Sequence, residues 1–490
     1  MENPGGEGQL AAADRERNRP GAPGSLARGD TPRVTKRNGS ALLAALAAVV
    51  VLISVGIYVG VGGARSGGDP AAATRPQHNN NGASAHGNGN GNGNGGNNSA
   101  APAATGRWVG TWSAAPAAAE PNSLHGHAGK SIRNVVHTSV GGTGVRVRLS
   151  NLYGTRPLSI TAASVALAAA PSNPTAASDS LRRLTFAGRP AVSVPAGQEV
   201  VSDPVRFAVP AAADLLVSTY SPTSAGPATY HPYARQTSYL AEGDRTADPR
   251  GFAYTEQSPF WRYLTGVDVY SAEAEGTVVV IGDSITDGIT STAGANHRWP
   301  DFLAQRLREE RGAPRYGVLN QGISGNRVLV DGSRFSPNNG PSGLSRFERD
   351  VLTRSEVQAV VLHLGINDIL KTPRQLEAER IVEGLQQMVR QAHGRGIRVT
   401  GGTLLPFGGH RGYSAETETV RRQVNQAIRS GRVFDAVVDF DRALRDPAAP
   451  HRLLPAYDSG DHLHPSDEGF RAMAHALDLR DLKGSAPARL

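Results

Sequence analysis

The chain has 490 residues, a formal net charge of +8 and no cysteine. Without cysteine, disulfide bonds, cysteine-based zinc sites and a cysteine nucleophile are excluded. The positive charge is not gathered into Lys/Arg runs interleaved with aromatic residues, so no nucleic-acid partner is expected, and the length favours two folded units with linkers.

The first 39 residues are polar and rich in Pro and Gly, which predicts a disordered tail. Residues 40–63 carry no charge, and a helix of this length can cross a hydrocarbon core about 30 Å thick. Basic residues are denser before this segment than after it, so the positive-inside rule places the tail 1–39 in the cytoplasm. We therefore predict one transmembrane helix that holds the protein at the cell membrane, with all later residues outside the cell.

A cleaved signal peptide is the alternative for residues 40–63, because Gly62 and Ala64 could occupy the small-residue positions of a cleavage site. The apolar run is longer than the hydrophobic segment of most signal peptides, which favours the anchor. Both alternatives export the rest of the chain, and cleavage would make the protein secreted. Residues 64–106 include HNNNGASAHGNGNGNGNGGNN, which has little to bury and predicts a flexible linker.

Residues 107–272 show short strand patterns separated by Gly, Pro and Asn. The stretch VRVRLSN, Val145 to Asn151, alternates apolar and polar residues as a half-exposed strand does. Similar stretches follow, which predicts an all-β sandwich domain of jelly-roll type. Its role stays open between sugar binding and packing against the domain that follows.

Residues 273–484 have a different pattern, in which apolar strands alternate with helical stretches. Strands are expected at 277–282, 317–320, 357–364, 397–405 and 433–440. This alternation predicts an α/β domain whose parallel sheet is covered on both faces. In the helix expected to begin near Pro300, Leu303 and Leu307 fall on one face.

Four polar fragments follow strands of this predicted sheet or lie near its carboxyl end. They are GDSITDG with Ser284, LNQGISGN, LGIND and SGDHLHPSDEGF. In parallel sheets the functional crevice lies beyond the carboxyl ends of the strands. A serine esterase needs a hydroxyl, a neutral imidazole, a carboxylate that orients it, and donors for the oxyanion. The fragments contain all of these groups.

Asp461 and His464 are three residues apart, so the carboxylate can accept from Nδ1 while Nε2 turns towards Ser284. The alternative is a surface turn in which Ser466 caps a terminal helix, and both can hold together. His462 competes for the role of base, although its neighbour Asp461 cannot easily reach its ring. A metal site formed by these residues with Asp458 is less expected, because no second ligand cluster accompanies them.

Gly322 and Asn367 are the candidate oxyanion donors. Gly322 lacks a side chain, so its backbone N–H can approach a substrate, and Asn367 can add an amide donor. Alternatively, Gly322 is a loop hinge and Asn367 closes a strand through an Asx-turn.

In its order of motifs, the chain resembles the SGNH/GDSL hydrolase family, whose four conserved blocks carry Ser, Gly, Asn and His. The resemblance implies a flavodoxin-like three-layer α/β/α fold, with Ser284 as nucleophile, Asp461 as orienting acid and His464 as base. It also implies an oxyanion hole formed by the Ser284 N–H, Gly322 and Asn367. GDSI stands where the family has Gly-Asp-Ser-Leu. The β-rich region with VRVRLSNLYGTRPL looks like that of exported actinobacterial members.

The expected function is that of an extracellular serine esterase that hydrolyses carboxylic esters through an acyl-enzyme on Ser284, with no cofactor and no metal. Its partner is an ester substrate, either a small molecule or one linked to a polysaccharide. A carbohydrate O-acetyl esterase of wall or plant polysaccharide is an alternative. A non-catalytic surface protein that binds polysaccharide is an alternative of a different class.

Overall fold

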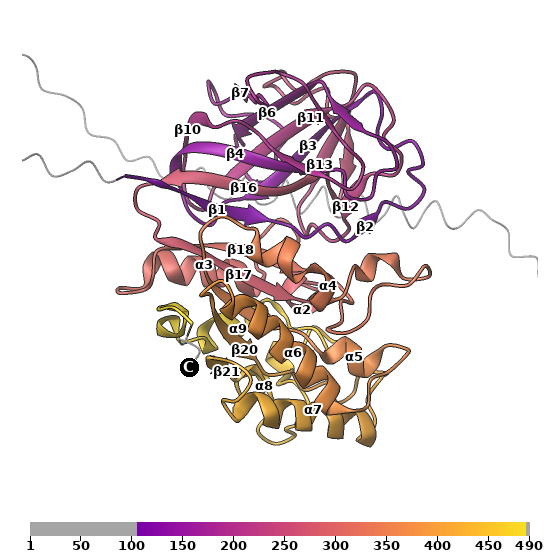
Figure 1. The fold of residues 1–490 in the computed structure, drawn as a ribbon, viewed down its shortest axis with the longest axis vertical. Helices are drawn as coiled ribbons and strands as arrows, with labels where there is room; N and C mark the ends of the chain where they lie inside the picture. Colours follow the sequence, from indigo (N-terminus) through magenta and orange to yellow (C-terminus); the bar gives the residue numbers. More distant parts are fainter. Residues whose placement is uncertain (1–104, 487–490) are drawn as a thin grey trace, which may run out of the picture. The chain divides into compact units, whose positions relative to one another are not determined.

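The computed structural model describes residues 105–486 (Figure 1). The predicted tail 1–39, the predicted transmembrane helix 40–63 and nearly all of the linker 64–106 lie outside the described residues, so these stay predictions. Within residues 105–486, no helix is both long and apolar enough to cross a membrane.

The region from β1 to β16 is built of antiparallel strands in two larger sheets and two small ones. The first larger sheet contains β1 (Arg107–Ser113), β16 (Leu264–Ser271), β4 (Gly142–Ser150), β10 (Val205–Val209) and β9 (Glu199–Val201). The second contains β14 (Glu256–Ser258), β13 (Ser238–Glu242), β3 (Lys130–His137), β11 (Asp214–Tyr220), β6 (Ala162–Leu167) and β7 (Arg182–Arg183). The small sheets pair β15 (Trp261–Arg262), β12 (Thr229–His231) and β2 (Ala118–Ala119), and β5 (Leu158–Ile160) with β8 (Val192–Val194).

The two larger sheets of this strand-rich region share one apolar cluster. Val145, Val147 and Leu149 of β4 are fully buried in it, while Arg146 and Arg148 between them are partly exposed. Side chains of β3, β6 and β11 from the other sheet join the same cluster. The predicted alternation of VRVRLSN is therefore confirmed, and the region is strand-rich as expected. Its assignment as a jelly-roll sandwich stays a prediction.

The later residues form a five-stranded parallel sheet in the order β18–β17–β19–β20–β21. Its strands are β17 (Gly276–Gly282), β18 (Tyr316–Gly322), β19 (Val357–His363), β20 (Arg398–Gly402) and β21 (Ala436–Val438). This is the 2-1-3-4-5 order of flavodoxin-like sheets.

Helices cover both faces of the parallel sheet. Alternate residues of β17 point to opposite faces: Val279 and Ile281 pack with α6 (Ala378–His393) and α7 (Ala415–Arg429), whereas Val278 and Val280 pack with α3 (Trp299–Glu309) and α9 (Asp467–Ala476). The remaining helical segments are α2 (Ser284–Asp287), α4 (Gly343–Phe347), α5 (Ile366–Leu370), α8 (Phe440–Leu444), the π-helical turn Glu348–Leu352 and the 3₁₀ turns Pro337–Asn339, Pro455–Tyr457 and Leu479–Leu482. The predicted parallel α/β arrangement is confirmed.

Of two further predicted details of this region, the buried face of the first long helix is confirmed and the length of the last strand is wrong. Leu303 and Leu307 are both buried on one face of α3, with Pro300 in its first turn, as expected. The strand expected at 433–440 is shorter, Ala436–Val438, because Asp439 accepts a hydrogen bond from the Arg442 N–H and caps α8. An apolar run does not show by itself where a strand gives way to a buried helix.

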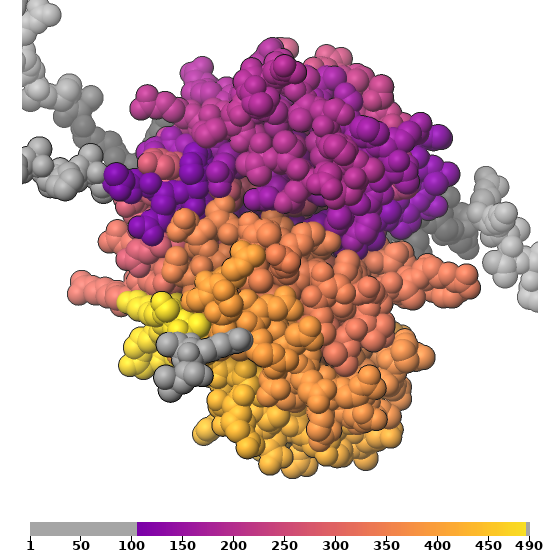
Figure 2. Space-filling view, viewed as in Figure 1, coloured from indigo at the N-terminus to yellow at the C-terminus, as the bar shows by residue number. Residues whose placement is uncertain are grey.

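The strand-rich region packs directly on the α/β region, as the space-filling view shows (Figure 2). The Gly110 N–H of β1 donates to Thr277 Oγ1 of β17 at 3.0 Å. A Cβ added to Gly317 of β18 would lie only 2.0 Å from the Gly110 carbonyl oxygen. The two backbones are thus in contact at a point where no side chain would fit.

Glycines also allow α2 to fold back over the carboxyl ends of the strands. Gly282 of β17 pairs with Gly322 of β18 in the parallel register. A Cβ at Gly282 would lie 2.1 Å from Thr286 Oγ1, and one at Gly322 would lie 2.3 Å from the Asp287 backbone nitrogen. Since Asp287 meets Gly322 with backbone atoms, which cannot rotate away, Gly322 is required by packing.

We predict that Gly322→Ala lowers the free energy of unfolding by about 1–3 kcal/mol, the usual cost of overpacking. Urea denaturation measures this loss. The matched control is Gly266→Ala in β16, a buried strand position where a Cβ would meet only ordinary contacts, the nearest at 3.5 Å. Equal stability of the two variants would contradict the packing role of Gly322.

Candidate active site

Ser284 stands at the first position of α2, directly after the buried strand β17. Asp283 caps this single turn, since its Oδ1 accepts the N–H of Ile285 at 3.0 Å. Gly288 ends the turn in the left-handed conformation, with φ of 89°, which glycine adopts at little cost. The strand and the capped turn together fix the position of the Ser284 hydroxyl.

Ser284, His464 and Asp461 form a continuous hydrogen-bonded chain. His464 Nε2 lies 2.8 Å from Ser284 Oγ, and His464 Nδ1 lies 2.6 Å from Asp461 Oδ2. The three side chains predicted from the sequence are therefore brought together, although 180 residues separate Ser284 from His464.

The loop before α9 holds Asp461 and His464 in this arrangement. Asp461 Oδ1 accepts the backbone N–H groups of Leu463 and His464, at 2.9 and 2.8 Å. Ser466 caps α9 by accepting the Gly469 N–H, so the alternative capping role holds together with the site. His462 makes a separate pair: its Nδ1 lies 2.6 Å from Asp458 Oδ2. His464, and not His462, is thus the ring bonded to Ser284.

The charge of Asp461 determines which nitrogen of His464 carries the proton. Burial acts to raise the pKa of Asp461, but hydrogen bonds from the His464 ring and from two backbone N–H groups outweigh it and lower the pKa well below its usual range. A carboxylate only accepts, so Nδ1 of His464 donates to it. In the neutral imidazole, Nε2 then has a lone pair facing the Ser284 O–H and can take its proton.

Asn367 lies across the same pocket and carries a free donor. The residue is 5% exposed, and its Nδ2 is buried without a hydrogen-bond partner among the described residues. An unpaired buried amide donor costs free energy. This cost is understandable if a substrate oxygen accepts from Nδ2 during the reaction.

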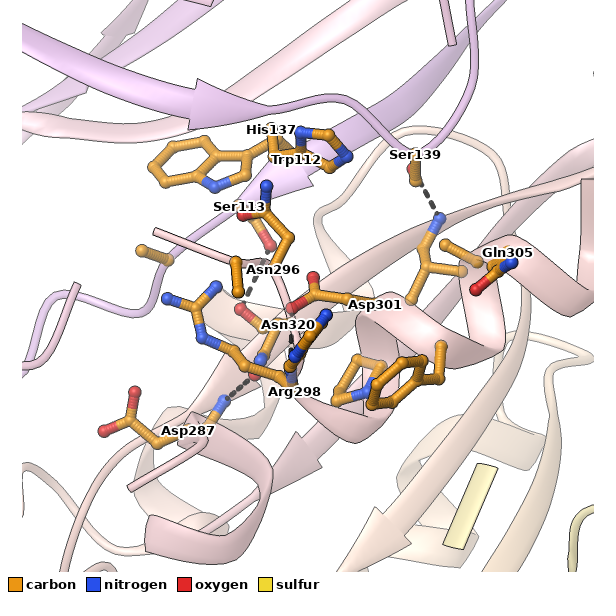
Figure 3. Close-up of a pocket in the computed structure, with 18 of the residues that line it drawn as sticks. Trp112, Ser113, His137, Ser139, Asp287, Asn296, Arg298, Asp301, Gln305 and Asn320 are labelled. Carbon is orange, nitrogen blue, oxygen red and sulfur yellow. Dashed lines mark hydrogen bonds between the residues drawn. The ribbon is translucent and has the colours of Figure 1, made fainter. Parts of the chain in front are cut away.

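The structure corrects the prediction for Gly322. The Gly322 N–H donates to Asn320 Oδ1 at 2.9 Å, so it is not free to bind an oxyanion. Gly322 lines a separate cavity of about 380 Å³ between the strand-rich and α/β regions. Figure 3 shows Asn320 and Asp287, which line the same cavity. Gly322 does not line the pocket that contains Ser284.

Gly325 has the position that was expected of Gly322. It lines the Ser284 pocket with a φ of +80°, and no acceptor for its N–H is found among residues 105–486. Both glycines belong to the same fragment, QGISGN. The sequence offered no means to choose between them, because the choice depends on the Asn320 side chain that occupies the Gly322 N–H.

The pocket around Ser284 has a volume of about 850 Å³ and is open to solvent. Tyr233 of the strand-rich region and Asn339 of the 3₁₀ turn Pro337–Asn339 both line it. In the described part of the chain, no group of three or more His, Asp or Glu side chains could hold a metal ion.

Asp283 is a buried carboxyl group next to Ser284. Burial raises the pKa of Asp283 to about 7, an effect partly offset by the hydrogen bond from the Ile285 N–H. Its second oxygen, Oδ2, has no hydrogen-bond partner among the described residues. Near neutral pH a large fraction of Asp283 is therefore uncharged.

Comparisons with known proteins identify the α/β region. Residues 280–472 match the model of the GDSL-like lipase/acylhydrolase family, so the chain carries a domain of this family there. The predicted resemblance is confirmed for this segment, whereas the exported actinobacterial type stays a prediction. No curated protein sequence matches the chain.

Among solved structures, the chain is similar to a G-D-S-L family protein from Desulfitobacterium hafniense DCB-2, with 23% identity over 41% of this chain and 96% of the other, and a TM-score of 0.32. A GDSL-like lipase from Bacteroides thetaiotaomicron has 21% identity over 41% and 84%, with a TM-score of 0.30. Est24, a carbohydrate acetylesterase from Sinorhizobium meliloti, has 17% identity over 41% and 95%, with a TM-score of 0.32.

The raised pKa of Asp283 can be tested through the pH dependence of the free energy of unfolding. Its pKa is higher in the folded state than the ordinary value near 3.9, so the stability that it contributes at low pH is lost as pH rises towards 7. Asp283→Asn keeps the capping oxygen but cannot ionise. We predict that the free energy of unfolding of this variant, minus that of the wild type, increases by about 1 kcal/mol per pH unit between pH 5 and 7.

Urea denaturation at several pH values measures this difference. The control is Asp203→Asn, at a carboxyl whose pKa is lowered by hydrogen bonds from the Gly188 N–H and the Thr185 hydroxyl. Asp203 is ionised in both states above pH 5, so its variant should show no such trend. If the free energies of unfolding of Asp283→Asn and of the wild type differ by the same amount at every pH, the pKa of Asp283 is not raised.

Proposed function

We propose that the GDSL-like lipase/acylhydrolase domain of this chain hydrolyses carboxylic esters through an acyl-enzyme on Ser284. The observation that carries the proposal is the hydrogen-bonded chain from Ser284 Oγ through His464 to Asp461, with distances of 2.8 and 2.6 Å. Such a chain supplies the nucleophile, the base and the group that orients the base.

In the proposed reaction, Ser284 Oγ attacks the ester carbonyl carbon while His464 Nε2 takes the hydroxyl proton. The carbonyl oxygen becomes an oxyanion, which accepts hydrogen bonds from Asn367 Nδ2 and from the N–H groups of Ser284 and Gly325. When the tetrahedral intermediate collapses, the C–O bond to the alcohol breaks and His464 returns the proton to the leaving oxygen. A water activated by His464 then attacks the acyl-enzyme, and the released Ser284 regains its proton.

The pocket favours a short acyl group and a polar alcohol. The apolar side chains that line it are Ile289, Leu370 and Leu463, and the remaining lining groups are mostly polar or charged. A carbohydrate O-acetyl esterase is therefore the second candidate within the same reaction class, since an acetyl group needs little apolar contact and a sugar presents hydroxyl groups.

The proposed location follows from the sequence alone. A helix formed by residues 40–63 would hold the enzyme at the outer face of the cell membrane, and cleavage of this segment would release it.

A non-catalytic polysaccharide-binding protein has no need for the unpaired donor of Asn367 beside a serine bonded to histidine.

We predict that Ser284→Ala lowers kcat for p-nitrophenyl acetate by at least about 10⁴-fold, because the nucleophile is lost. Asn367→Ala should lower kcat by about 10²–10³-fold with a small change in KM, since the amide acts on the oxyanion of the transition state. The control is Ser238→Ala, at a fully buried serine of β13 whose hydroxyl has no hydrogen-bond partner among the described residues. Near wild-type activity of folded Ser284→Ala would refute the proposal.

A further inference from the structure

Three basic side chains line the candidate active-site pocket without an ion-pair partner among the described residues. Lys371 and Arg374 follow α5, and Arg411 lies in the loop before α7. Within residues 105–486, none of the three forms an ion pair or a side-chain hydrogen bond. Elsewhere in the chain, arginines such as Arg421 and Arg429 are paired with carboxylates at 2.5 to 2.9 Å. The basic side chains at the pocket are therefore available to a ligand.

The ammonium group of Lys371 lies close to the expected oxyanion site. A Cβ added to Gly325 would lie 3.0 Å from Lys371 Nζ. Burial lowers the pKa of Lys371, and the positive charges of Arg327 and Arg411 lower it further, while the carboxyl of Asp283 acts in the opposite direction. Among the described residues that line the pocket, Asp461 alone carries a carboxylate, and it is already bonded to His464. Like charges thus face one another here, and an anion would relieve their repulsion.

We propose that Lys371, Arg374 and Arg411 bind a carboxylate group on the alcohol part of the ester, so that the preferred substrates are acidic esters such as acetylated uronic-acid polysaccharides. Arg374 and Arg411 are exposed residues that line the pocket, so the proposal places the alcohol part of the ester beside them. This inference rests on the proposed function and adds a substrate class to it.

A pair of acetyl esters of equal size tests the inference. 4-Acetoxybenzoate carries a carboxylate, and 4-acetoxybenzamide is its neutral counterpart. After division by the alkaline hydrolysis rate of each ester, kcat/KM should favour the benzoate by about tenfold at low salt. The preference should fall towards one at about 0.5 M NaCl, where the Debye length is only a few ångström.

The double variant Arg374→Gln/Arg411→Gln should lose most of this preference, whereas Arg189→Gln should keep it. Arg189 is an exposed arginine of the strand-rich region, so its replacement removes a charge away from the pocket. Equal normalised rates for the two esters with the wild-type enzyme would overturn the inference and leave the esterase proposal intact. Failure to hydrolyse either ester would instead refute the proposed function, and the inference with it.

A second and independent observation concerns a buried link between the strand-rich region and the active-site loops. His231 of β12 places Nε2 2.9 Å from Asp287 Oδ1 of α2, and Nδ1 2.9 Å from the carbonyl oxygen of Ala115. The side chains of His231 and Asp287 are each 4% exposed. The carboxylate of Asp287 only accepts hydrogen bonds, so Nε2 of His231 can donate to it.

Asp287 also binds the loop that carries Gly325. Its Oδ2 accepts the Ser324 N–H at 2.9 Å and the Ser324 hydroxyl at 2.5 Å. Ser324 directly precedes Gly325, whose N–H is a proposed oxyanion donor. Figure 3 shows Asp287 at the edge of the cavity between the two regions, with Trp112 and His137 of the strand-rich region on the opposite side.

We infer that His231 is a positioning residue for ester hydrolysis, acting through Asp287 and Ser324 to aim the Gly325 N–H at the oxyanion. The inference gives the strand-rich region a part in the reaction, and it rests on the proposed function. A misaimed donor weakens binding of the transition state more than binding of the ester, so kcat should change and KM should not.

His231→Gln keeps one donor for Asp287, and His231→Ala removes it. With active sites counted by titration with a fluorophosphonate, kcat for p-nitrophenyl acetate should fall about tenfold or more in His231→Ala and less in His231→Gln, with KM within about twofold of wild type. The control is His127→Gln, which breaks a partly buried contact between His127 and Glu120 at 2.8 Å within the strand-rich region. Wild-type kcat per titrated site in both His231 variants would overturn the inference, and so would an equal loss in His127→Gln.

Discussion

The close packing of α2 on the glycine ends of β17 and β18 is the constraint on which the site depends. Thr286 and Asp287 occupy the space where side chains of Gly282 and Gly322 would stand. Any side chain there would lift the turn that begins with Ser284. The buried guanidinium of Arg346 secures the same strand ends, since it donates to the carbonyl oxygens of Gly282 and Gln321 at 3.0 and 2.7 Å.

Other groups of the site are arranged around this fixed turn. His464 reaches Ser284 from the loop before α9, and Asn367 comes from the turn after β19. Asp368, beside Asn367, accepts the N–H groups of Val328 and Leu329, which ties α5 to the loop after β18. Through Asp287 and His231, the strand-rich region is joined to the same hydrogen-bonded frame. The site is therefore held by contacts from both regions, and the reacting groups need little rearrangement.

The parallel sheet and the Asp461–His464 contact could be predicted from local patterns in the sequence, whereas the meeting of His464 with Ser284 was expected from the strand-end positions of their fragments and from the resemblance to the SGNH/GDSL hydrolase family. Apolar runs alternating with helical periodicity indicate the sheet, and the three-residue spacing of Asp461 and His464 suits one carboxylate–imidazole contact. The choice between Gly322 and Gly325 could not be made in this way, since it depends on the hydrogen bond from Gly322 to Asn320. His231 was also missed, because it is 56 residues from Asp287 and in the other region, and no local pattern connects the two.

The most direct test of the nucleophile is the mass of the active-site peptide after reaction with a fluorophosphonate, which phosphonylates an activated serine. We expect one phosphonyl group per chain, located on Ser284 by fragmentation. His464→Ala, which keeps the serine but removes its base, should react far more slowly. Labelling of a different serine, or no labelling of the folded wild-type protein, would contradict the claim that Ser284 is the nucleophile.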